Sequence, residues 1–149
     1  MQVLLTQVLF TLALLLAGIV SAAAESAAPN LKGTWIGTFK SLVYGNNPHH
    51  PGAESLADPP RVREVKFTFE VEGQDGRLLW GKSWSSPDRK EPFAFAMSED
   101  RKTIVGTDTD GQFLLKLLSA NRMELCYTHT YLSPTQSMVA TCGNIDRMK

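Results

Sequence analysis

Short segments in which apolar and polar residues alternate follow one another along the chain from Gly33 onward. The clearest is residues 62–72, where Val65, Phe67 and Phe69 fall on one face while charged residues and threonine fall on the other. A period of two is typical of a strand with one buried face. Turn residues separate the segments and none has a helical period, so the pattern predicts an all-β domain.

Eight such segments occur, joined mostly by short turns. They are residues 33–43, 62–72, 77–86, 93–97, 103–107, 112–118, 123–131 and 138–145. A meander of this kind leaves two open edges, and closing it into a barrel pairs both of them. We therefore expect an eight-stranded antiparallel up-and-down β-barrel, whose interior is filled by side chains or holds one small ligand. The charged outward face of the second segment argues against a barrel embedded in lipid.

One connection, residues 44–61, is much longer than the others and contains four prolines without any periodic pattern. Loops of this length in a compact domain are usually binding loops or lids. We expect it to lie over the open end of the barrel. A loop without a role is the alternative.

The first 24 residues differ from the rest, because an apolar run over residues 3–20 ends in small residues and no charge occurs before Glu25. This pattern predicts a signal peptide over residues 1–24, cleaved after Ala24 or one residue earlier, with an uncleaved membrane anchor as the alternative. The mature protein would be exported to the periplasm or secreted, with no membrane span left. Residues 25–32 would form a flexible tail and residues 33–149 the barrel domain.

Only two cysteines occur, Cys126 and Cys142. An exported protein with an even number of cysteines is expected to be oxidised. A hairpin folded about Pro134, midway between them, places the two residues directly opposite each other on neighbouring strands. We expect a disulfide on the outer wall of the barrel, with two free thiols as the alternative.

The seventh segment, residues 123–131, is the most informative for function. If its apolar positions set the inward face, an imidazole and two phenol groups also point inward, and neighbouring strands add two hydroxyls. The polar side chains expected inside are Ser41, Tyr127, His129, Tyr131 and Thr141. Polar groups in an otherwise apolar interior are typical of a small-molecule pocket, and the alternative is that they only satisfy one another.

Two alternative turns can connect the second segment to the third. A two-residue turn at Asp75 and Gly76 directs both Trp80 and Trp84 into the barrel. A three-residue loop that includes Gln74 shifts the register by one residue and directs both indoles outward, as a patch for a protein partner. We favour the first turn because it buries more apolar area.

Metal and enzyme signals are weak. The histidines His49, His50 and His129 would suit zinc or copper, but a solvated proline-rich loop is the better interpretation of the first two. Asp108 and Asp110 resemble the start of a calcium loop, but the twelfth position lacks glutamate, which favours a hairpin turn. No nucleotide-binding or hydrolase motif occurs. We expect no resident metal, no cofactor and no enzymatic activity.

The segment Gly33-Thr34-Trp35 that opens the first strand, the long first loop and a basic residue near the C-terminus resemble the calycins. These include the lipocalins, the avidins, the fatty-acid-binding proteins and small bacterial metalloprotease inhibitors. The resemblance implies that Trp35 packs across the closed end of the barrel and that Arg147 lies over it as a cation–π pair. Gly37 replaces the biotin-binding asparagine of avidins, which argues against biotin.

Two functional hypotheses remain. The first is a barrel that binds a small hydrophobic or aromatic ligand in its interior. The second is a protein-interaction module, such as a protease inhibitor, that acts through residues 25–32 or through an exposed patch of Trp80 and Trp84. The chain carries 15 basic and 15 acidic side chains, a balance that argues against a nucleic-acid partner.

Overall fold

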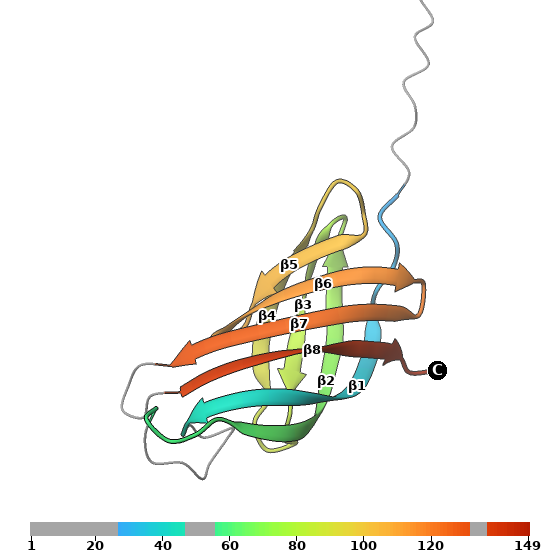
Figure 1. Ribbon diagram of the computed structural model, residues 1–149. Helices are drawn as coiled ribbons and strands as arrows, with labels where there is room; N and C mark the ends of the chain where they lie inside the picture. Colours follow the sequence, from blue (N-terminus) through green and yellow to red (C-terminus); the bar gives the residue numbers. More distant parts are fainter. Residues whose placement is uncertain (1–26, 47–55, 132–136) are drawn as a thin grey trace, which may run out of the picture.

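The computed structural model describes residues 27–46, 56–131 and 137–149. Eight antiparallel strands in this part of the chain form a closed barrel in sequence order (Figure 1). The strands are β1 (Gly33–Gly45), β2 (Arg61–Asp75), β3 (Leu78–Trp84), β4 (Glu91–Met97), β5 (Thr103–Thr107), β6 (Gly111–Ser119), β7 (Arg122–Tyr131) and β8 (Ser137–Arg147). β1 pairs with both β2 and β8, so the sheet has no free edge. The predicted all-β, up-and-down barrel is confirmed.

The predicted signal peptide and most of the long β1–β2 connection lie outside the described residues. Within the described ranges, no helix is long and apolar enough to cross a membrane.

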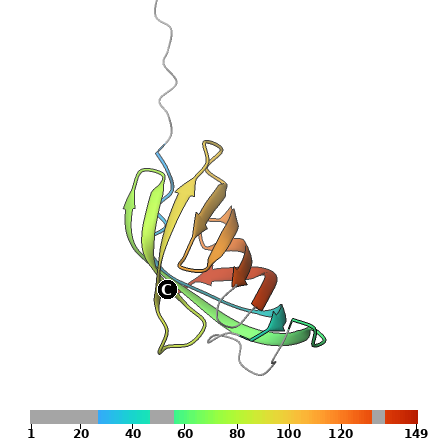
Figure 2. The same cartoon turned by 90° about the vertical axis from the view of Figure 1, so that its left-hand side faces the viewer.

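Up-and-down topology sends alternate connections to opposite ends of the barrel. The C-terminal ends of β1, β3, β5 and β7 lie at one end, together with the β3–β4 and β5–β6 connections, and we call this end the mouth. The chain that precedes β1 and the β2–β3, β4–β5 and β6–β7 turns lie at the other end, which we call the floor. Figure 2, turned by 90°, shows the strands wrapping around the barrel between these two ends.

Aromatic rings fill the middle of the barrel. The buried ring of Phe69 lies at its centre, with ring centroids 5.6 Å from Phe93, 5.7 Å from Phe95 and 5.2 Å from Phe113. Below them, only about 10 Å³ of cavity remains between the core and Trp35. Offset and edge-on contacts of this kind are favourable, and they leave no room for a ligand in the lower barrel.

The floor has the arrangement that the resemblance to calycins implied. Trp35 is fully buried, and the Arg147 guanidinium carbon lies 5.4 Å from the centroid of its ring. The indole nitrogen of Trp35 donates a hydrogen bond to the carbonyl of Leu31 at 2.9 Å. Leu31 is itself only 1% exposed, and its amide donates to the Gln74 side chain at 2.9 Å. The last part of the expected flexible tail is therefore fixed to the barrel, because Leu31 completes the apolar floor.

The register of β2 and β3 differs from the favoured expectation. The turn contains Gly76 and Arg77, with Gly76 in the left-handed region at φ 54°, and a bulge follows beyond Gly73. Trp80 consequently pairs with Gly73 rather than Val71 and points outward, with 48% of its surface exposed. The inward position predicted for Trp80 is wrong.

Gly73 gives the physical reason for this orientation. A Cβ atom at Gly73 would lie 2.1 Å from the Trp80 ring, so only glycine leaves space for the indole against the outer wall. The inward positions of β3 are instead Leu79, Gly81 and Ser83, all of them buried. This is the face that the alternative register predicted, reached here through a different turn and a bulge.

A disulfide joins Cys126 of β7 to Cys142 of β8 on the outer wall. The two residues are direct cross-strand partners with a Cα–Cα distance of 4.1 Å. The predicted bridge is confirmed, and it links the paired strands β7 and β8.

Opening this disulfide should lower stability without abolishing the barrel. The bridge spans a sequence separation of 16, for which loop-closure entropy gives roughly 3 kcal/mol of stabilisation. We expect reduction to lower the melting temperature by about 10 °C while the β-sheet circular dichroism persists below the transition. The double variant Cys126→Ala/Cys142→Ala should melt at this lower temperature with or without reductant. Equal melting temperatures for the oxidised and reduced wild type would contradict the assignment.

Candidate functional site

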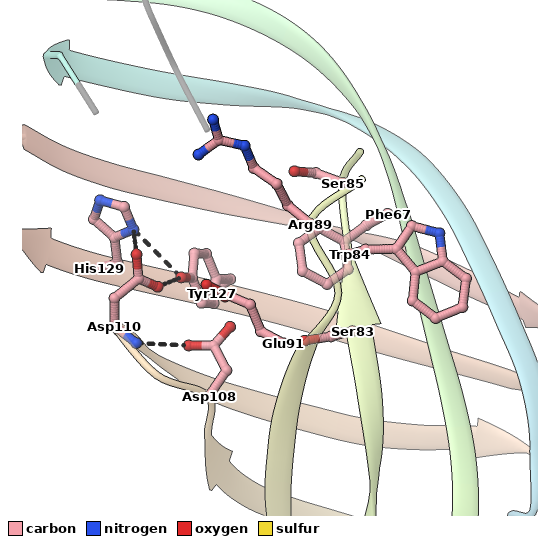
Figure 3. A pocket seen from close by; sticks show the side chains of 10 residues that line it. All are labelled: Phe67, Ser83, Trp84, Ser85, Arg89, Glu91, Asp108, Asp110, Tyr127 and His129. Atoms are coloured by element: carbon pink, nitrogen blue, oxygen red, sulfur yellow. Dashed lines mark hydrogen bonds and ion pairs between the residues drawn. The ribbon is translucent and has the colours of Figure 1, made fainter. Parts of the chain in front are cut away.

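A small polar recess lies at the mouth, above the aromatic core. Its cavity volume is about 30 Å³. Ten side chains line it, and Figure 3 shows them: Phe67, Ser83, Trp84, Ser85, Arg89, Glu91, Asp108, Asp110, Tyr127 and His129. They come from β2, β3, β4, β7 and the β3–β4 and β5–β6 connections, so the recess exists only in the closed barrel.

Strand pairing brings three carboxylates together at this recess. The β4–β5 register pairs Ala94 with Thr107, so the start of β4, with Glu91, and the turn after β5, with Asp108 and Asp110, lie at the same end of the barrel. One oxygen from each of the three carboxylates lies within 4.8 Å of the others. We refer to Glu91, Asp108 and Asp110 as the mouth carboxylates.

The β5–β6 turn holds two of the mouth carboxylates in place. Asp108 Oδ1 accepts hydrogen bonds from the amides of Gly111 at 2.8 Å and Asp110 at 3.3 Å. The Thr107 hydroxyl closes the same turn by donating to the Gly111 carbonyl at 2.6 Å. An aspartate that bonds to the amides following it is typical of a tight turn. The hairpin turn predicted for this segment is present, and it also directs Asp110 into the recess.

A buried network of side chains forms the wall next to the mouth carboxylates. The Tyr127 hydroxyl donates to Asp110 Oδ1 at 2.9 Å and lies 3.3 Å from His129 Nδ1. His129 is 5% exposed, and its Nε2 lies 3.0 Å from the hydroxyl of Ser137. His129 Nδ1 also lies 3.5 Å from Asp110 Oδ2. The network fixes the imidazole through both ring nitrogens.

Burial and crowded negative charge determine the acid–base properties of the recess. Burial, and after it the nearby charges of Asp110 and Glu91, raise the pKa of Asp108 to about 6, against the lowering effect of the hydrogen bonds from the amides of Gly111 and Asp110. Burial first, and then the charges of Asp108 and Asp110, raise the pKa of Tyr127 far above its usual value. Tyr127 therefore keeps its proton and acts as a donor to Asp110.

The order Asp110, His129, Ser137 is that of a hydrolytic triad, but the geometry does not support a nucleophile. Ser137 is 1% exposed and is not among the side chains that line the recess. Its hydroxyl faces His129 from inside the barrel wall. A substrate carbonyl must reach the nucleophile of such a triad. Because the Ser137 hydroxyl is enclosed, it orients the His129 ring and does not act as a nucleophile.

The structure brings together some of the predicted ligand-binding residues and separates others. Trp84, Tyr127 and His129 line the recess. Ser41 is buried inside the barrel but does not line the recess. Thr141 does not line the recess either, and its hydroxyl donates a hydrogen bond to the Lys40 carbonyl at 2.9 Å. Trp80 lies on the outer wall, and the side chain of Tyr131 lies outside what the structure describes, as do His49 and His50.

Sequence reasoning did not assign most of the polar lining. The residues it left out of the site are Phe67, Ser83, Ser85, Arg89, Glu91, Asp108 and Asp110. The Asp108-x-Asp110 pattern was a usable signal, but its partner Glu91 lies on the preceding strand. Only the pairing of β4 with β5 indicates that the start of β4 and the turn after β5 lie at the same end of the barrel.

Removing the Tyr127 hydroxyl should destabilise the protein while leaving the core packed. Its ring packs on Phe113 with a centroid distance of 4.6 Å, and phenylalanine preserves that contact. Tyr127→Phe leaves Asp110 without its hydroxyl donor, which should cost about 1–3 kcal/mol in the free energy of unfolding. Urea denaturation measures this loss. Tyr44→Phe, a matched change on β1, should cost clearly less, and equal losses would contradict the role of the network.

Comparison with known proteins leaves the family open. No protein-family model matches the chain, and no curated protein sequence matches it. Among solved structures, the chain is similar to the S-type phycobiliprotein lyase CPES from Guillardia theta, with a TM-score of 0.39 and 11% sequence identity. The similarity covers 80% of this chain and 89% of the lyase chain. The eight-stranded closed barrel is established from its own strand pairing, and the resemblance to calycins stays a prediction.

Proposed function

We propose that this protein is an exported binding barrel that holds a small, partly aromatic ligand at the mouth. The observation that carries the proposal is the contrast between the two parts of the interior. Rings fill the lower barrel, whereas polar and charged side chains converge on a recess beneath the mouth connections. Polar groups in a partly buried position cost free energy unless they are satisfied, so their concentration at one end favours a binding role.

The lining indicates how such a ligand would be held. Phe67 and Trp84 supply apolar walls, and the Ser83 and Ser85 hydroxyls and Arg89 supply polar contacts. The recess is too small for a whole drug-sized molecule, for which pockets of about 300–1,000 Å³ are usual. One polar group of the ligand would enter the recess, and its aromatic part would lie on Phe67 and Trp84. Catalysis is not part of the proposal, because Ser137 is enclosed by the wall.

Two features support export. The predicted signal peptide precedes the barrel, and the Cys126–Cys142 bridge is of the kind that persists in oxidising compartments.

Native mass spectrometry of protein isolated from the exported fraction tests ligand and export together. We expect a mass that corresponds to cleavage between Ala23 and Ser26, together with a co-purified small molecule. The affinity of that molecule should fall roughly 10- to 100-fold in Trp84→Ala, because about 1.5–3 kcal/mol of apolar burial is lost. Trp80→Ala removes the same side chain from the outer wall and should bind normally. Equal losses in both variants, or retention of Met1 on a membrane, would contradict the proposal.

A second candidate function rests on the outer wall. Cross-strand pairing aligns Leu78, Ala96, Val105 and Leu114 in one row that ends at the disulfide. The large apolar side chains of this row are about half exposed, as is the nearby Trp80. Aligned apolar residues on an outer sheet face are typical of a protein-binding surface.

A protease-inhibition assay tests this second function. If the row inhibits a secreted metalloprotease, Trp80→Ala should raise the inhibition constant about tenfold or more, whereas Trp84→Ala should leave it unchanged. Deletion of residues 25–27 tests whether the tail contributes to inhibition, since Leu31 and the rest of the floor stay intact. A wild-type protein that inhibits no metalloprotease in a broad panel would exclude this version of the interaction hypothesis.

A further inference from the structure

The outer wall over β5, β6, β7 and β8 carries two neighbouring rows of uncharged side chains. Cross-strand pairing aligns the first row, which consists of Val105, Leu114, Cys126 and Cys142. The second row, two residues nearer the mouth on each strand, consists of Thr107, Gln112, Thr128 and Ala140. We call these two rows the uncharged wall, and β6, β7 and β8 cross the front of Figure 1 side by side.

The uncharged wall is exposed and partly hollowed. Val105 and Leu114 are about half exposed, and Cys142 is exposed as well. An open groove of about 600 Å³ lies over β5, β6 and β7, and Val105, Leu114 and Cys126 are among the residues that line it. An exposed apolar surface with a hollow is typical of a face that binds another protein.

Two opposite charges border the uncharged wall on its floor side. Lys116 of β6 pairs directly with Glu124 of β7, and both side chains are exposed. Neither forms an ion pair with another side chain in the part of the chain that the structure describes. Both charges are therefore available to a partner that presents the opposite charges in the reverse order.

A second copy of this chain presents them in that order. A two-fold axis parallel to the strands, midway between β6 and β7, exchanges β6 with β7 and β5 with β8. When two copies pack face to face about this axis, Lys116 of each copy lies opposite Glu124 of the other. The first rows then oppose each other so that the disulfide of one copy covers Val105 and Leu114, which line the groove of the other. The axis also keeps the two sheets aligned, as face-to-face sheets usually are to within about 30°.

We propose that the protein forms a symmetric homodimer through the uncharged wall. The two rows bring apolar surface together without burying any charge, and the two Lys116–Glu124 pairs at the rim fix the arrangement. The equal numbers of basic and acidic side chains leave no net charge that would drive two copies apart. Because only two rows on four strands take part, the interface is small, and we expect a dissociation constant in the micromolar range.

The dimer goes beyond the proposed ligand-binding function and is compatible with it. No residue that lines the recess belongs to the uncharged wall, and an axis parallel to the strands turns both mouths toward the same side of the dimer. The dimer competes with the second candidate function, because Val105 and Leu114 belong to both surfaces. Self-association is measured on the purified protein alone, so its failure is distinguishable from a failure of ligand binding or of protease inhibition.

Sedimentation velocity of the oxidised exported protein provides the first test. We expect a concentration-dependent shift from the mass of one copy to that of two. Leu114→Glu places a charge at the centre of the face and should weaken the dimer at least tenfold. The matched control is Val62→Glu on β2, which changes a side chain that is 66% exposed on the opposite side of the barrel, and it should dimerise like the wild type. A wild-type protein that stays monomeric at about 500 µM would overturn the proposal, because a micromolar dimer is mostly assembled at that concentration.

Charge reversal tests the two-fold arrangement itself. Lys116→Glu and Glu124→Lys should each weaken the homodimer about tenfold or more, since each places like charges opposite each other twice. A mixture of the two variants should form a heterodimer in native mass spectrometry, because both rim pairs are then attractive. The double variant Lys116→Glu/Glu124→Lys should dimerise like the wild type. Circular dichroism verifies that each variant is folded, and folded single variants that dimerise normally, or that form no heterodimer when mixed, would refute this interface.

Discussion

Closure of the sheet through the double pairing of β1 is the constraint on which the rest of the structure depends. Because β1 bonds to β2 on one side and β8 on the other, every strand has one face inside and one outside. Trp35 and Leu31 then seal one end, and Arg147 lies over the indole. With the floor closed and the middle filled by rings, polar side chains can converge only at the mouth.

The mouth carboxylates are hard to explain as stabilising features. Burial of Asp108 and the repulsion between neighbouring carboxylates both raise its pKa, which means that the folded barrel disfavours its ionised form. The amides of Asp110 and Gly111, which donate hydrogen bonds to Asp108, offset part of this cost. Proteins keep locally unfavourable arrangements chiefly where they serve function. The recess therefore differs in kind from the Phe69 cluster beneath it, which contributes to stability by packing alone.

Much of the fold follows from local pattern, whereas the site depends on pairing between distant residues. Alternation along each segment predicts the strands, the inward faces of β1 and β7, and the closed barrel, because side-chain direction repeats every two residues. The disulfide follows from the midpoint at Pro134. Glu91 is different, since nothing near it in the chain marks it as a partner of Asp110. The pairing of β4 with β5 brings them to the same end of the barrel, and the tight β5–β6 turn then directs Asp110 toward the recess.

The orientation of β3 shows how one local irregularity decides between two functions. Neither turn considered from the sequence occurs. The turn consists of Gly76 and Arg77, one residue later than the favoured turn, and the bulge between Val71 and Gly73 shifts the pairing of β3 by one more residue. Composition alone does not reveal a bulge, because the free-energy cost of a bulge depends on the side chains around it. Here the bulge places Gly73 against the Trp80 ring, where a larger residue would not fit. As a result, Trp80 lies on the outer wall while Trp84, at the end of the same strand, lines the recess. Trp80 and Trp84 share the outward-facing positions of β3, and only Trp84, at the end of the strand, also borders the recess. The two hypotheses thus rest on different tryptophans of one strand, and substituting each in turn separates them.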